Sequence, residues 1–537
     1  MTRPLGAQIS HMLKDRGVDV IFGIPGVHNQ EMYRGIEEAG ITHVLARHEQ
    51  GAGFMADGYA RATGRFGVCY LITGPGLLNA LTPLGQAYSD NVSVLAICSC
   101  LDNTVRRKGQ LHQMKDQEAA AAAVCDWSET ADDAATAYHL VDRALRAFWY
   151  GGDRRPKAIH VPIEVLKSHA GPVGRGRTGE SRQLPDPTNV MYLRTRLRKA
   201  RKPLLILGGG AVDLALPWGD RDGTPVADLM ARLNCASFCT FAGRGILPRD
   251  GDLHFGPYLT RASSADVVGQ ADLVIAIGTQ LAEVDLWRED LGHRHDAMIR
   301  VDTSDEVLNT QNGCAFNIKV DARSFVRALL DGWDGAALMN DWDEGEVHRA
   351  RARWRAEVDA EFPNVLPVMD ALRAAMPADA MIYSDMTQFA YAAKECWDMP
   401  RAGHWHHPSG FGTLGYALPA AIGGAVARQG APTACIIGDY GFQYTVAELG
   451  TAVELGLPLP IILWDNGKLG AIEDSMIAAQ IAPNSVIQRN PDFLALAKAY
   501  GAEAVEPATL DDIAPALEAA FKTRGPTVIR LTPALSA

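Results

Sequence analysis

The segment ACIIGDYGFQYTVAELGTAVELGLPLPIILWDNGKLG, residues 434–470, contains two apolar runs that each end in a polar, glycine-containing turn. Residues 434–437 lead into GDYG at 438–441, and residues 459–463 lead into DNG at 465–467. Continuous apolar runs of this length are typical of strands in a parallel sheet that helices cover on both faces. The segment therefore predicts two strands of a doubly wound α/β domain, with a polar turn at the carboxyl end of each.

Asp439 and Asn466 stand in these two turns. Ligands collect at the carboxyl ends of strands in a doubly wound sheet, so the two side chains can converge if their strands are near neighbours. A carboxylate and an amide oxygen are hard ligands that suit Mg²⁺ or Ca²⁺, and Mg²⁺ completes its shell with phosphate and water. The alternative is that these are two unrelated polar turns, because Asp and Asn favour turns in any case.

Similar apolar runs, separated by helical segments, recur at residues 20–22, 42–45, 66–73, 92–98, 157–161, 203–207, 273–277, 381–384 and 527–531. We therefore expect an α/β protein with three doubly wound parallel-sheet domains, at residues 1–168, 189–335 and 363–537. The Gly-, Pro-, Arg- and Ser-rich residues 169–188 and the charged residues 336–362 are expected to be linkers.

Composition narrows the classes of partner. The net charge of −12 argues against nucleic acid and against acidic membranes. The N-terminus lacks the apolar core of a signal peptide, and no uninterrupted apolar stretch is long enough to span a bilayer. The nine cysteines form no paired CxxC array and are expected to be reduced core thiols. We expect a soluble, cytoplasmic protein.

Glu49 opens a second informative stretch, RHEQGAGFMADGYAR at residues 47–61. A Glu in the first turn of a helix often only stabilises the helix dipole at the surface. The small residues at 51–53 permit close packing, which leaves open the alternative that Glu49 is buried and takes part in proton transfer.

These motifs resemble those of the thiamine-diphosphate-dependent enzymes, in the acetolactate synthase and 2-oxo acid decarboxylase group. The resemblance extends over essentially the whole chain and includes FGIPG at 22–26, TGPGLLN at 73–79 and GFGTLGYALPAAIG at 410–423. It implies a pyrimidine-binding, a middle and a diphosphate-binding domain, in that order. It also implies that Asp439, Asn466 and the main-chain carbonyl of Lys468 hold Mg²⁺ against the diphosphate of the cofactor.

The resemblance implies further roles. Glu49 occupies the position that activates the cofactor at N1′ of its aminopyrimidine, and Leu414 the position that props the cofactor in a bent conformation. His112 aligns with the first His of the His-His pair of pyruvate-type decarboxylases, but Gln113 stands where the second would be. Glu473 is a weaker catalytic candidate, one residue late in an ungapped count. The implied cofactor contacts are Pro25, Gly26, Glu49, Thr73, Asn79, Thr387, Gln388, Gly412, Leu414, Gly438, Gly441, Phe442, Asn466, Leu469 and Gly470.

Within the family, the motifs IFGIPGVH, SDMTQ and RNPDF look most like those of enzymes that decarboxylate 5-guanidino-2-oxopentanoate. Acetolactate synthase, which joins two 2-oxo acids, is the alternative. Its Phe-Gln-Glu motif is replaced here by residues 114–116, and its Arg-Phe-Asp-Asp-Arg element by residues 279–283. Both departures also weaken the case for FAD as a second cofactor. A non-catalytic interaction protein is disfavoured because Glu49 and both metal-ligand side chains are present. The resemblance further implies a homodimer or homotetramer with active sites shared between subunits.

Overall fold

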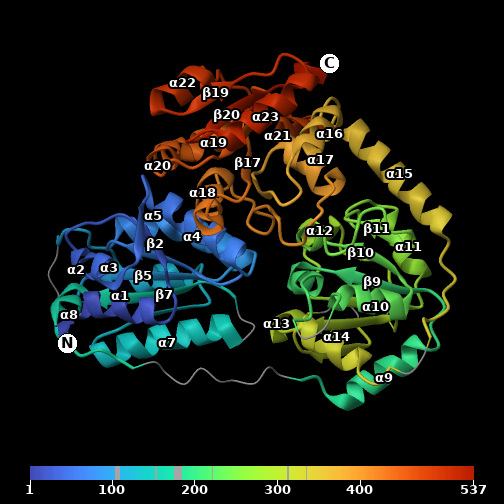
Figure 1. Cartoon of the computed structure of the whole chain (residues 1–537), viewed down its shortest axis with the longest axis horizontal. Coiled ribbons are helices and arrows are strands. Elements are labelled where there is room, and N and C mark those ends of the chain that lie inside the picture. Colours follow the sequence, from blue (N-terminus) through green and yellow to red (C-terminus); the bar gives the residue numbers. More distant parts are fainter. Residues whose placement is uncertain are drawn as a thin grey trace.

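The computed structural model describes residues 1–102, 109–150, 154–174, 184–219, 222–294, 296–310, 314–333 and 336–536. Three α/β domains follow one another along the chain and lie at the corners of a triangle (Figure 1). Each contains a parallel sheet that has six strands among the described residues. The expected fold class is therefore confirmed, and each apolar run predicted above overlaps a strand.

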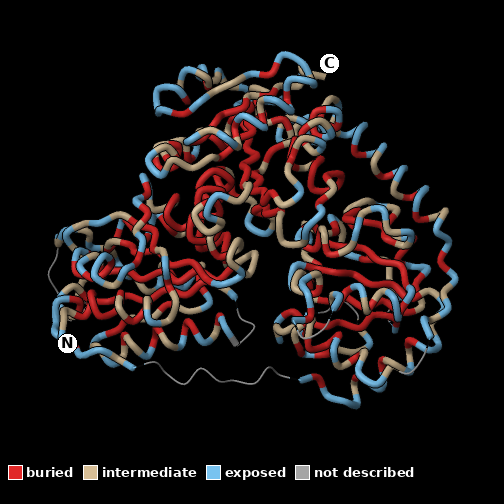
Figure 2. The backbone as a smooth tube through the Cα atoms, viewed as in Figure 1, coloured by how far each residue is buried: buried red, intermediate tan, exposed pale blue. Residues whose placement is uncertain are grey.

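The sheet of the N-terminal domain has the order β3-β2-β4-β5-β7-β6. Helices α1 and α7 cover one face and α4 and α5 the other, so the strands are buried on both sides (Figure 2). The elements are β1 (Arg3–Pro4), α1 (Leu5–Asp15), β2 (Val20–Gly23), α2 (Gln30–Arg34), α3 (Ile36–Ala39), β3 (Thr42–Leu45), α4 (Glu49–Thr63), β4 (Gly67–Leu71), α5 (Pro75–Ser89), β5 (Val94–Cys100), α6 (Gln117–Ala122), β6 (Trp127–Thr130), α7 (Ala134–Tyr150), β7 (Lys157–Pro162), α8 (Ile163–Lys167) and β8 (His169–Ala170).

The middle domain has the order β11-β10-β9-β12-β13-β14. Its elements are α9 (Pro187–Leu197), β9 (Pro203–Leu207), η1 (Gly209–Ala215), α10 (Pro225–Leu233), β10 (Ala236–Cys239), η2 (Phe241–Gly243), β11 (His254–Gly256), α11 (Ser264–Gln270), β12 (Leu273–Ile277), α12 (Glu283–Leu286), β13 (Met298–Asp302), α13 (Asp305–Leu308), β14 (Phe316–Lys319) and α14 (Ala322–Leu330). The glycine turn after β9 packs on the turn after β12, where a Cβ on Gly208 would lie 2.2 Å from the carbonyl oxygen of Gly278. Close packing of two turns therefore accounts for these glycines.

The C-terminal domain has the order β16-β15-β17-β18-β20-β19, which repeats the pattern of the N-terminal domain. Its elements are α16 (Leu366–Ala375), β15 (Met381–Ser384), α17 (Gln388–Cys396), β16 (Trp405–His406), α18 (Ala417–Arg428), β17 (Thr433–Gly438), α19 (Asp439–Thr445), η3 (Val446–Glu448), α20 (Leu449–Glu454), β18 (Pro460–Trp464), α21 (Gly470–Ala478), α22 (Phe493–Tyr500), β19 (Glu503–Val505), η4 (Leu510–Asp512), α23 (Ile513–Lys522), β20 (Thr527–Leu531) and η5 (Pro533–Ser536). In both domains the strand order reverses between the first and third strands in sequence, where open α/β sheets bind ligands.

The N-terminal and C-terminal domains share one hydrophobic core through helices α4 and α18 (Figure 1). A Cβ on Gly58 would lie 2.0 Å from the carbonyl oxygen of Ala420, and one on Gly423 would lie 1.9 Å from that of Met55. Only glycine allows the two helix backbones to approach this closely. This contact fixes the start of α4, and with it Glu49, relative to the C-terminal domain.

The segments expected to be linkers contain regular structure. Within residues 336–362 the chain forms helix α15 (Glu344–Glu361), which runs along the outside of the molecule between the middle and C-terminal domains (Figure 1). Its buried Trp354 packs against Phe238 and Tyr258 of the middle domain, with ring centroids 5.9 and 5.5 Å apart. Within residues 169–188, strand β8 pairs with β1 and helix α9 begins at Pro187, while residues 175–183 lie outside the described residues.

All nine cysteines are free thiols, and eight of them are buried. No helix in the described ranges is both long and apolar enough to cross a bilayer.

Candidate functional site

The two polar turns of the C-terminal domain meet at the carboxyl edge of its sheet. Strands β17 and β18 are parallel neighbours, and Gly438 is in register with Trp464. The backbone N–H of Gly467 donates to Oδ2 of Asp439 at 3.0 Å. The second turn is thus folded over the carboxylate that ends the first strand, and the structure brings Asp439 and the 466–468 turn together.

Asp439 is held in place from several sides. Its Oδ1 accepts from the backbone N–H of Tyr440 at 3.0 Å, and its Oδ2 accepts from Nδ2 of Asn490 at 2.7 Å. Burial raises the pKa of its carboxyl above the ordinary value, against the lowering effect of these donors. A nearby cation would favour the ionised form that burial disfavours.

The oxygen donors at this edge suit a magnesium ion. Asp439 offers a carboxylate, Asn466 an amide oxygen and Lys468 a main-chain carbonyl, a set that leaves coordination positions for phosphate and water. No group of three or more His, Cys, Asp or Glu side chains in the described part of the chain could hold a metal. A site of this kind, with one carboxylate, is compatible with that finding.

Residues around the second turn are paired with one another. Asp465 accepts hydrogen bonds from Nε of Arg530 at 2.8 Å and from Nδ2 of Asn490 at 2.8 Å. Asn466 donates from Nδ2 to Oε1 of Gln388 at 2.7 Å. Asn490 therefore bridges the carboxylates of the two turns and fixes their separation.

Glu473 and Lys468 form an ion pair of 2.5 Å at the start of α21. The side chain of Glu473 is 17% exposed. Glu473 thus lies next to the proposed metal site, and its carboxylate is engaged by Lys468 rather than free to face a substrate in this arrangement.

Asp385 anchors the loop that carries Gly412 and Leu414. Its buried carboxylate accepts from the backbone N–H groups of Gly415 at 3.2 Å and Ala417 at 3.1 Å. Burial raises its pKa to about 7, although the N–H donors act in the opposite direction. Because Asp385 also precedes Thr387 and Gln388 in the loop after β15, one side chain ties together two loops that the resemblance assigns to the cofactor.

The other predicted residues of this domain surround the same edge. Leu414 is half-buried between the buried Thr413 and Gly415, so its side chain is partly open to a ligand. Phe442 is fully buried and packs on Phe493, with ring centroids 5.8 Å apart. Its side chain therefore belongs to the core, and only its main chain could contact a cofactor.

The two turns are lined by Gly438, Gly441, Leu469 and Gly470. A Cβ on Gly438 would lie 3.0 Å from Oγ1 of Thr387, and a Cβ on Gly470 would lie 2.5 Å from Nε2 of Gln388.

Glu49 is the first residue of α4 and is half-buried within one chain. Its Oε2 accepts from Nδ2 of Asn79 at 2.9 Å, and its Oε1 lies 3.2 Å from the position that a Cβ on Gly76 would take. The backbone N–H groups of Arg47 and His48, just before the helix, both donate to Oε1 of Glu448 at 3.0 Å. A side chain of the C-terminal domain therefore fixes the N-terminal end of α4.

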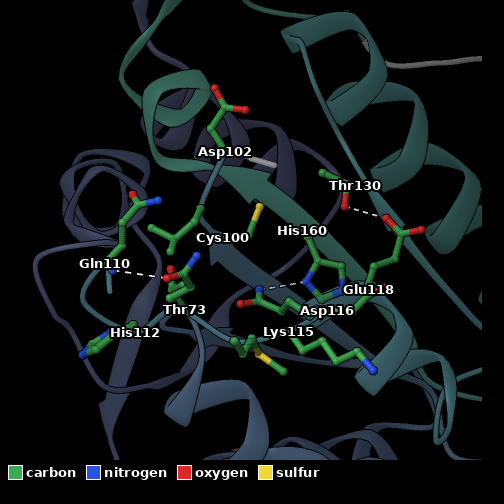
Figure 3. Close-up of a pocket in the computed structure, with 14 residues that line it drawn as sticks. Thr73, Cys100, Asp102, Gln110, His112, Lys115, Asp116, Glu118, Thr130 and His160 are labelled. Carbon is green, nitrogen blue, oxygen red and sulfur yellow. Dashed lines mark hydrogen bonds between the residues drawn. The ribbon is translucent and has the colours of Figure 1, made fainter. Parts of the chain in front are cut away.

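A polar cavity of about 200 Å³ lies at the carboxyl edge of the N-terminal sheet, and Thr73 and His112 are among its lining residues (Figure 3). His112 lies on the side of the cavity away from Glu118 and His160, and Thr130 donates to Glu118 at 2.5 Å (Figure 3). His160 is buried and its pKa is lowered to about 4 by burial. It is hydrogen-bonded to Gln117 at 3.0 Å and to Ser128 at 2.8 Å.

The predicted residues thus form two groups. The first group lies on the loops after β2, β4 and β5 and on helices α4 and α5, which follow β3 and β4: Pro25, Gly26, Glu49, Thr73, Asn79 and His112. The remaining predicted residues surround the carboxyl edge of the C-terminal sheet. In the described part of the chain no hydrogen bond joins Glu49 to Asp439, Asn466 or Lys468.

Asn490 and Glu448 hold residues of the site in place and were missed as functional residues from the sequence. Asn490 lies in the motif RNPDF, which the resemblance singled out without giving this residue a role, whereas Asp385 lies in the loop 385–388, which the resemblance matched to a cofactor-contacting loop. Glu448 carried no local signal, because its partners Arg47 and His48 are about 400 positions away.

Comparison with known proteins covers each of the three domains. The chain matches three sequence models described as thiamine pyrophosphate enzyme domains: the N-terminal TPP-binding domain over residues 3–120, the central domain over residues 192–329 and the C-terminal TPP-binding domain over residues 385–531.

Relatives extend over the full length. A Pseudomonas aeruginosa protein named as a probable 2-ketoarginine decarboxylase is 39% identical to this chain over 545 residues, covering 99% of this chain and 94% of the relative. The acetolactate synthase isozyme 2 large subunit of Escherichia coli is 28% identical, covering 98% of this chain and 95% of the relative. The acetolactate synthase large subunit of Haemophilus influenzae is 26% identical, covering 98% and 94%.

Proposed function

The chain belongs to the thiamine pyrophosphate enzyme family, and from that premise we propose that it decarboxylates a 2-oxo acid to an aldehyde and CO₂ without oxidation. The proposed substrate is 5-guanidino-2-oxopentanoate, which is 2-ketoarginine. The observation that carries this choice is the 39% identity, over almost the whole chain, to a protein named for that substrate.

The C-terminal domain would hold thiamine diphosphate through Mg²⁺, with Asp439, Asn466 and the Lys468 carbonyl as protein ligands. Gln388 supports this assignment because it orients the amide of Asn466 through the hydrogen bond from Nδ2. Thr387, Gly438, Gly441, Phe442, Leu469 and Gly470 would contact the diphosphate side, and Gly412 and Leu414 the pyrimidine side. When bound, the cofactor supplies a thiazolium ring that stabilises the electron pair left when CO₂ departs.

Glu49 would move a proton at N1′ of the aminopyrimidine. A carboxyl group that holds this proton favours the imino form of the pyrimidine, which is the form that can act as a base. Asn79 supports this role because it donates to Oε2 of Glu49 and thereby restricts the orientation of the carboxyl group. Pro25, Gly26 and Thr73 would line the same pyrimidine pocket.

We further propose a homodimer or homotetramer in which Glu49 of one subunit serves the cofactor bound by Asp439 of another. Large apolar side chains are exposed beside both groups of site residues: Val27 (63%) and Leu78 (47%) in the N-terminal domain, and Tyr444 (58%), Ile472 (53%) and Ile487 (71%) in the C-terminal domain. Exposed apolar side chains clustered at a site are typical of surfaces that a partner covers. The small-molecule substrate, the absence of a nucleic-acid partner and the cytoplasmic location also stay predictions.

Acetolactate synthesis is the second candidate, favoured by the similarity to acetolactate synthase subunits along nearly the full chain. The two reactions share the loss of CO₂ and differ in the fate of the remaining carbon, which takes a proton in one case and attacks a second 2-oxo acid in the other. Proton supply at the site therefore decides between them.

Product identification separates the two candidates. The protein, with thiamine diphosphate and Mg²⁺, is offered 5-guanidino-2-oxopentanoate and pyruvate separately, and products are identified by mass spectrometry. We expect CO₂ and 4-guanidinobutanal from the first substrate. Acetolactate from pyruvate, with no aldehyde from the guanidino substrate, would assign the chain to the synthases. Turnover of neither would reject both candidate substrates.

A further inference from the structure

The loop that joins β16 to α18, residues 407–416, is anchored at two points by carboxylates of the N-terminal domain. The backbone N–H of Gly410 donates to Oδ1 of Asp90, at the end of α5, at 2.9 Å. The hydroxyl of the fully buried Tyr416 donates to Oδ1 of Asp57, in α4, at 2.8 Å. The position of this loop of the C-terminal domain therefore depends on two side chains of another domain.

One arginine binds both anchoring carboxylates. Arg61 donates from Nε to Oδ1 of Asp57 at 2.7 Å and from Nη2 to Oδ2 of Asp90 at 2.8 Å. Gln86 donates from Nε2 to the same oxygen of Asp90 at 2.8 Å. The side chain of Asp57 is fully buried, and those of Arg61 and Asp90 are 14% and 11% exposed. Removal of one partner would leave a poorly solvated charge, so the two anchors form one unit.

The loop needs such anchors because it is rich in glycine. Three of the six residues from Gly410 to Gly415 are glycines, and Gly412 and Gly415 have φ of +67° and +82°, in the region that favours glycine. Glycine loses more conformational freedom on folding than any other residue, so contacts from outside must hold the loop in one conformation. Asp385 supplies them at the end of the loop, and Asp90 supplies one near its start.

The start of the loop also packs closely on helix α5. A Cβ on Gly410 would lie 2.9 Å from Cβ of Ser89, and a Cβ on Gly85 would lie 2.9 Å from the ring of Phe411. Glycine at both positions lets the loop approach the helix, and this approach brings the N–H of Gly410 to Asp90.

A polar atom between the two anchors is open to a ligand. Oγ1 of Thr413 is buried and has no hydrogen-bond partner among the described residues. Most buried polar groups in folded proteins have a partner, so the unpaired hydroxyl indicates that a ligand completes this part of the loop. Thr413 stands between Gly412 and Leu414, which are assigned above to the pyrimidine side of the cofactor.

We propose that Asp90 is a positioning residue for the cofactor. Its carboxylate, oriented by Arg61, holds the 407–416 loop in one conformation, and that conformation presents Gly412 and Leu414 to the pyrimidine. This proposal rests on the proposed function, because it requires that the C-terminal domain binds thiamine diphosphate. The diphosphate is assigned to the turns after β17 and β18, to which no hydrogen bond among the described residues joins Asp90. Asp90 should therefore affect binding of the organic part of the cofactor and not binding of the diphosphate.

Two ligands separate this role from general damage to the fold. Cofactor-free, full-length protein is titrated calorimetrically with thiamine diphosphate and, separately, with inorganic pyrophosphate, both with Mg²⁺. In Asp90→Ala we expect the affinity for thiamine diphosphate to fall about tenfold, which corresponds to the loss of one hydrogen bond to a charged group. The affinity for pyrophosphate should stay that of wild type. Asp90→Asn, which retains an acceptor oxygen for the N–H of Gly410, should be intermediate.

Three results of the titrations would overturn the proposal. The first is an unchanged affinity of Asp90→Ala for thiamine diphosphate, and the second is an equal loss of affinity for both ligands. The third is the absence of pyrophosphate binding by wild type, because the diphosphate side would then not bind independently of the loop.

Hydrogen exchange gives a second measurement that needs no ligand. In cofactor-free protein, peptides that cover residues 407–416 should exchange faster in Asp90→Ala than in wild type, because the N–H of Gly410 has lost its acceptor. Gly410→Ala, whose Cβ would meet Ser89, should have the same effect and serves if Asp90→Ala does not fold. Unchanged exchange in both variants would overturn the proposal. Faster exchange, in a protein whose wild type does not bind thiamine diphosphate, would reject the proposed function and retain the anchoring of the loop.

Asp142→Ala is the matched control. Asp142 pairs with Arg16 within the same domain and lies on α7, on the other face of the sheet from α4 and α5. This variant should leave the exchange of residues 407–416 and both affinities unchanged. The same changes in Asp142→Ala as in Asp90→Ala would show that loss of any ion pair in this domain disturbs the loop, and would overturn the proposal.

Discussion

The carboxylate of Glu448, in the C-terminal domain, accepts a 3.0 Å hydrogen bond from the backbone N–H of His48, the residue before Glu49. Glu448 is buried, and Thr451 donates to its second oxygen at 2.8 Å. The start of the helix that carries the proposed activating carboxylate is therefore set by the domain that carries the proposed metal site.

Replacing Glu448 should disturb Glu49. In Glu448→Ala the N–H groups of Arg47 and His48 lose their acceptor, which should cost about 1–2 kcal/mol of stability, as loss of a helix cap does. We expect kcat to fall while the KM for the 2-oxo acid changes little, with partial rescue in Glu448→Gln. Glu454→Gln is the control, because Glu454 forms an ion pair with the side chain of the same Arg47 and not with its backbone N–H. An unchanged kcat in Glu448→Ala would show that this contact does not position Glu49.

Asn490 should determine metal affinity. Its Nδ2 bridges Asp439 and Asp465, so its removal frees a carboxylate that must face the ion. Loss of a side chain that orients a metal ligand typically weakens metal binding by about 10–100-fold. We expect that loss for Asn490→Ala in a Mn²⁺ titration followed by electron paramagnetic resonance. Asn484→Ala, an exposed position on the loop after α21, should bind as wild type does. Equal affinity in both variants would contradict the assignment.

More of the fold than of the candidate site could be predicted from the sequence. Strands such as Leu273–Ile277 and Thr527–Leu531 lie where their apolar runs predicted them, because a parallel sheet covered on both faces requires continuous apolar sequence. The segment that forms helix α15 was expected to be a linker because it is rich in charged residues. Its buried face consists of four widely spaced residues, Val347, Ala350, Trp354 and Val358, which are too few to stand out in the sequence.

In the candidate site, the meeting of Asp439 with the DNG turn was predictable because both turns end strands. The partners that hold them were not, since Asn490 is 51 positions from Asp439 and Glu448 is 400 from His48. The rings of His28 and His112 are in contact, with centroids 4.8 Å apart, but the two residues lie on loops that leave different strands, and no local pattern places one loop against the other. Contacts of this kind follow from the strand order, which a single sequence does not specify.

Acid should destabilise the protein through His160. Its pKa is about 4 in the folded chain, against 6.5 for an ordinary histidine, because burial disfavours the charged ring. The contribution of the uncharged ring to the free energy of unfolding is fully present above pH 6.5 and is lost as the pH falls through 4. The total loss is about 3 kcal/mol. His160→Gln should be less stable than wild type at pH 7, and the gap in urea midpoint should narrow at pH 4.5. If the difference in urea midpoint between His160→Gln and wild type were the same at both pH values, the lowered pKa of His160 would not be the cause of the acid sensitivity. The control variant, His139→Gln, should have the urea midpoint of wild type at both pH values.

Mixing two inactive variants tests whether active sites are shared. Glu49→Gln and Asp439→Ala each remove one half of the proposed site. If the halves come from different subunits, random exchange in a dimer should restore about a quarter of wild-type activity, because one of the two sites in each hybrid is intact. Native mass spectrometry verifies the exchange. Hybrids that form without activity would place both residues in a site within one chain.

The most direct test of the account is the exchange of the C2 proton of bound thiamine diphosphate with deuterium, followed by quenched-flow NMR in wild type and Glu49→Gln. Both proteins are first shown to bind the cofactor with Mg²⁺. We predict fast exchange in wild type and exchange slower by about 10²–10⁴-fold in Glu49→Gln, the usual range for removal of a general acid–base group. Exchange equally fast in the variant, or no faster in wild type than for free cofactor, would contradict the assignment of Glu49 as the activating carboxylate.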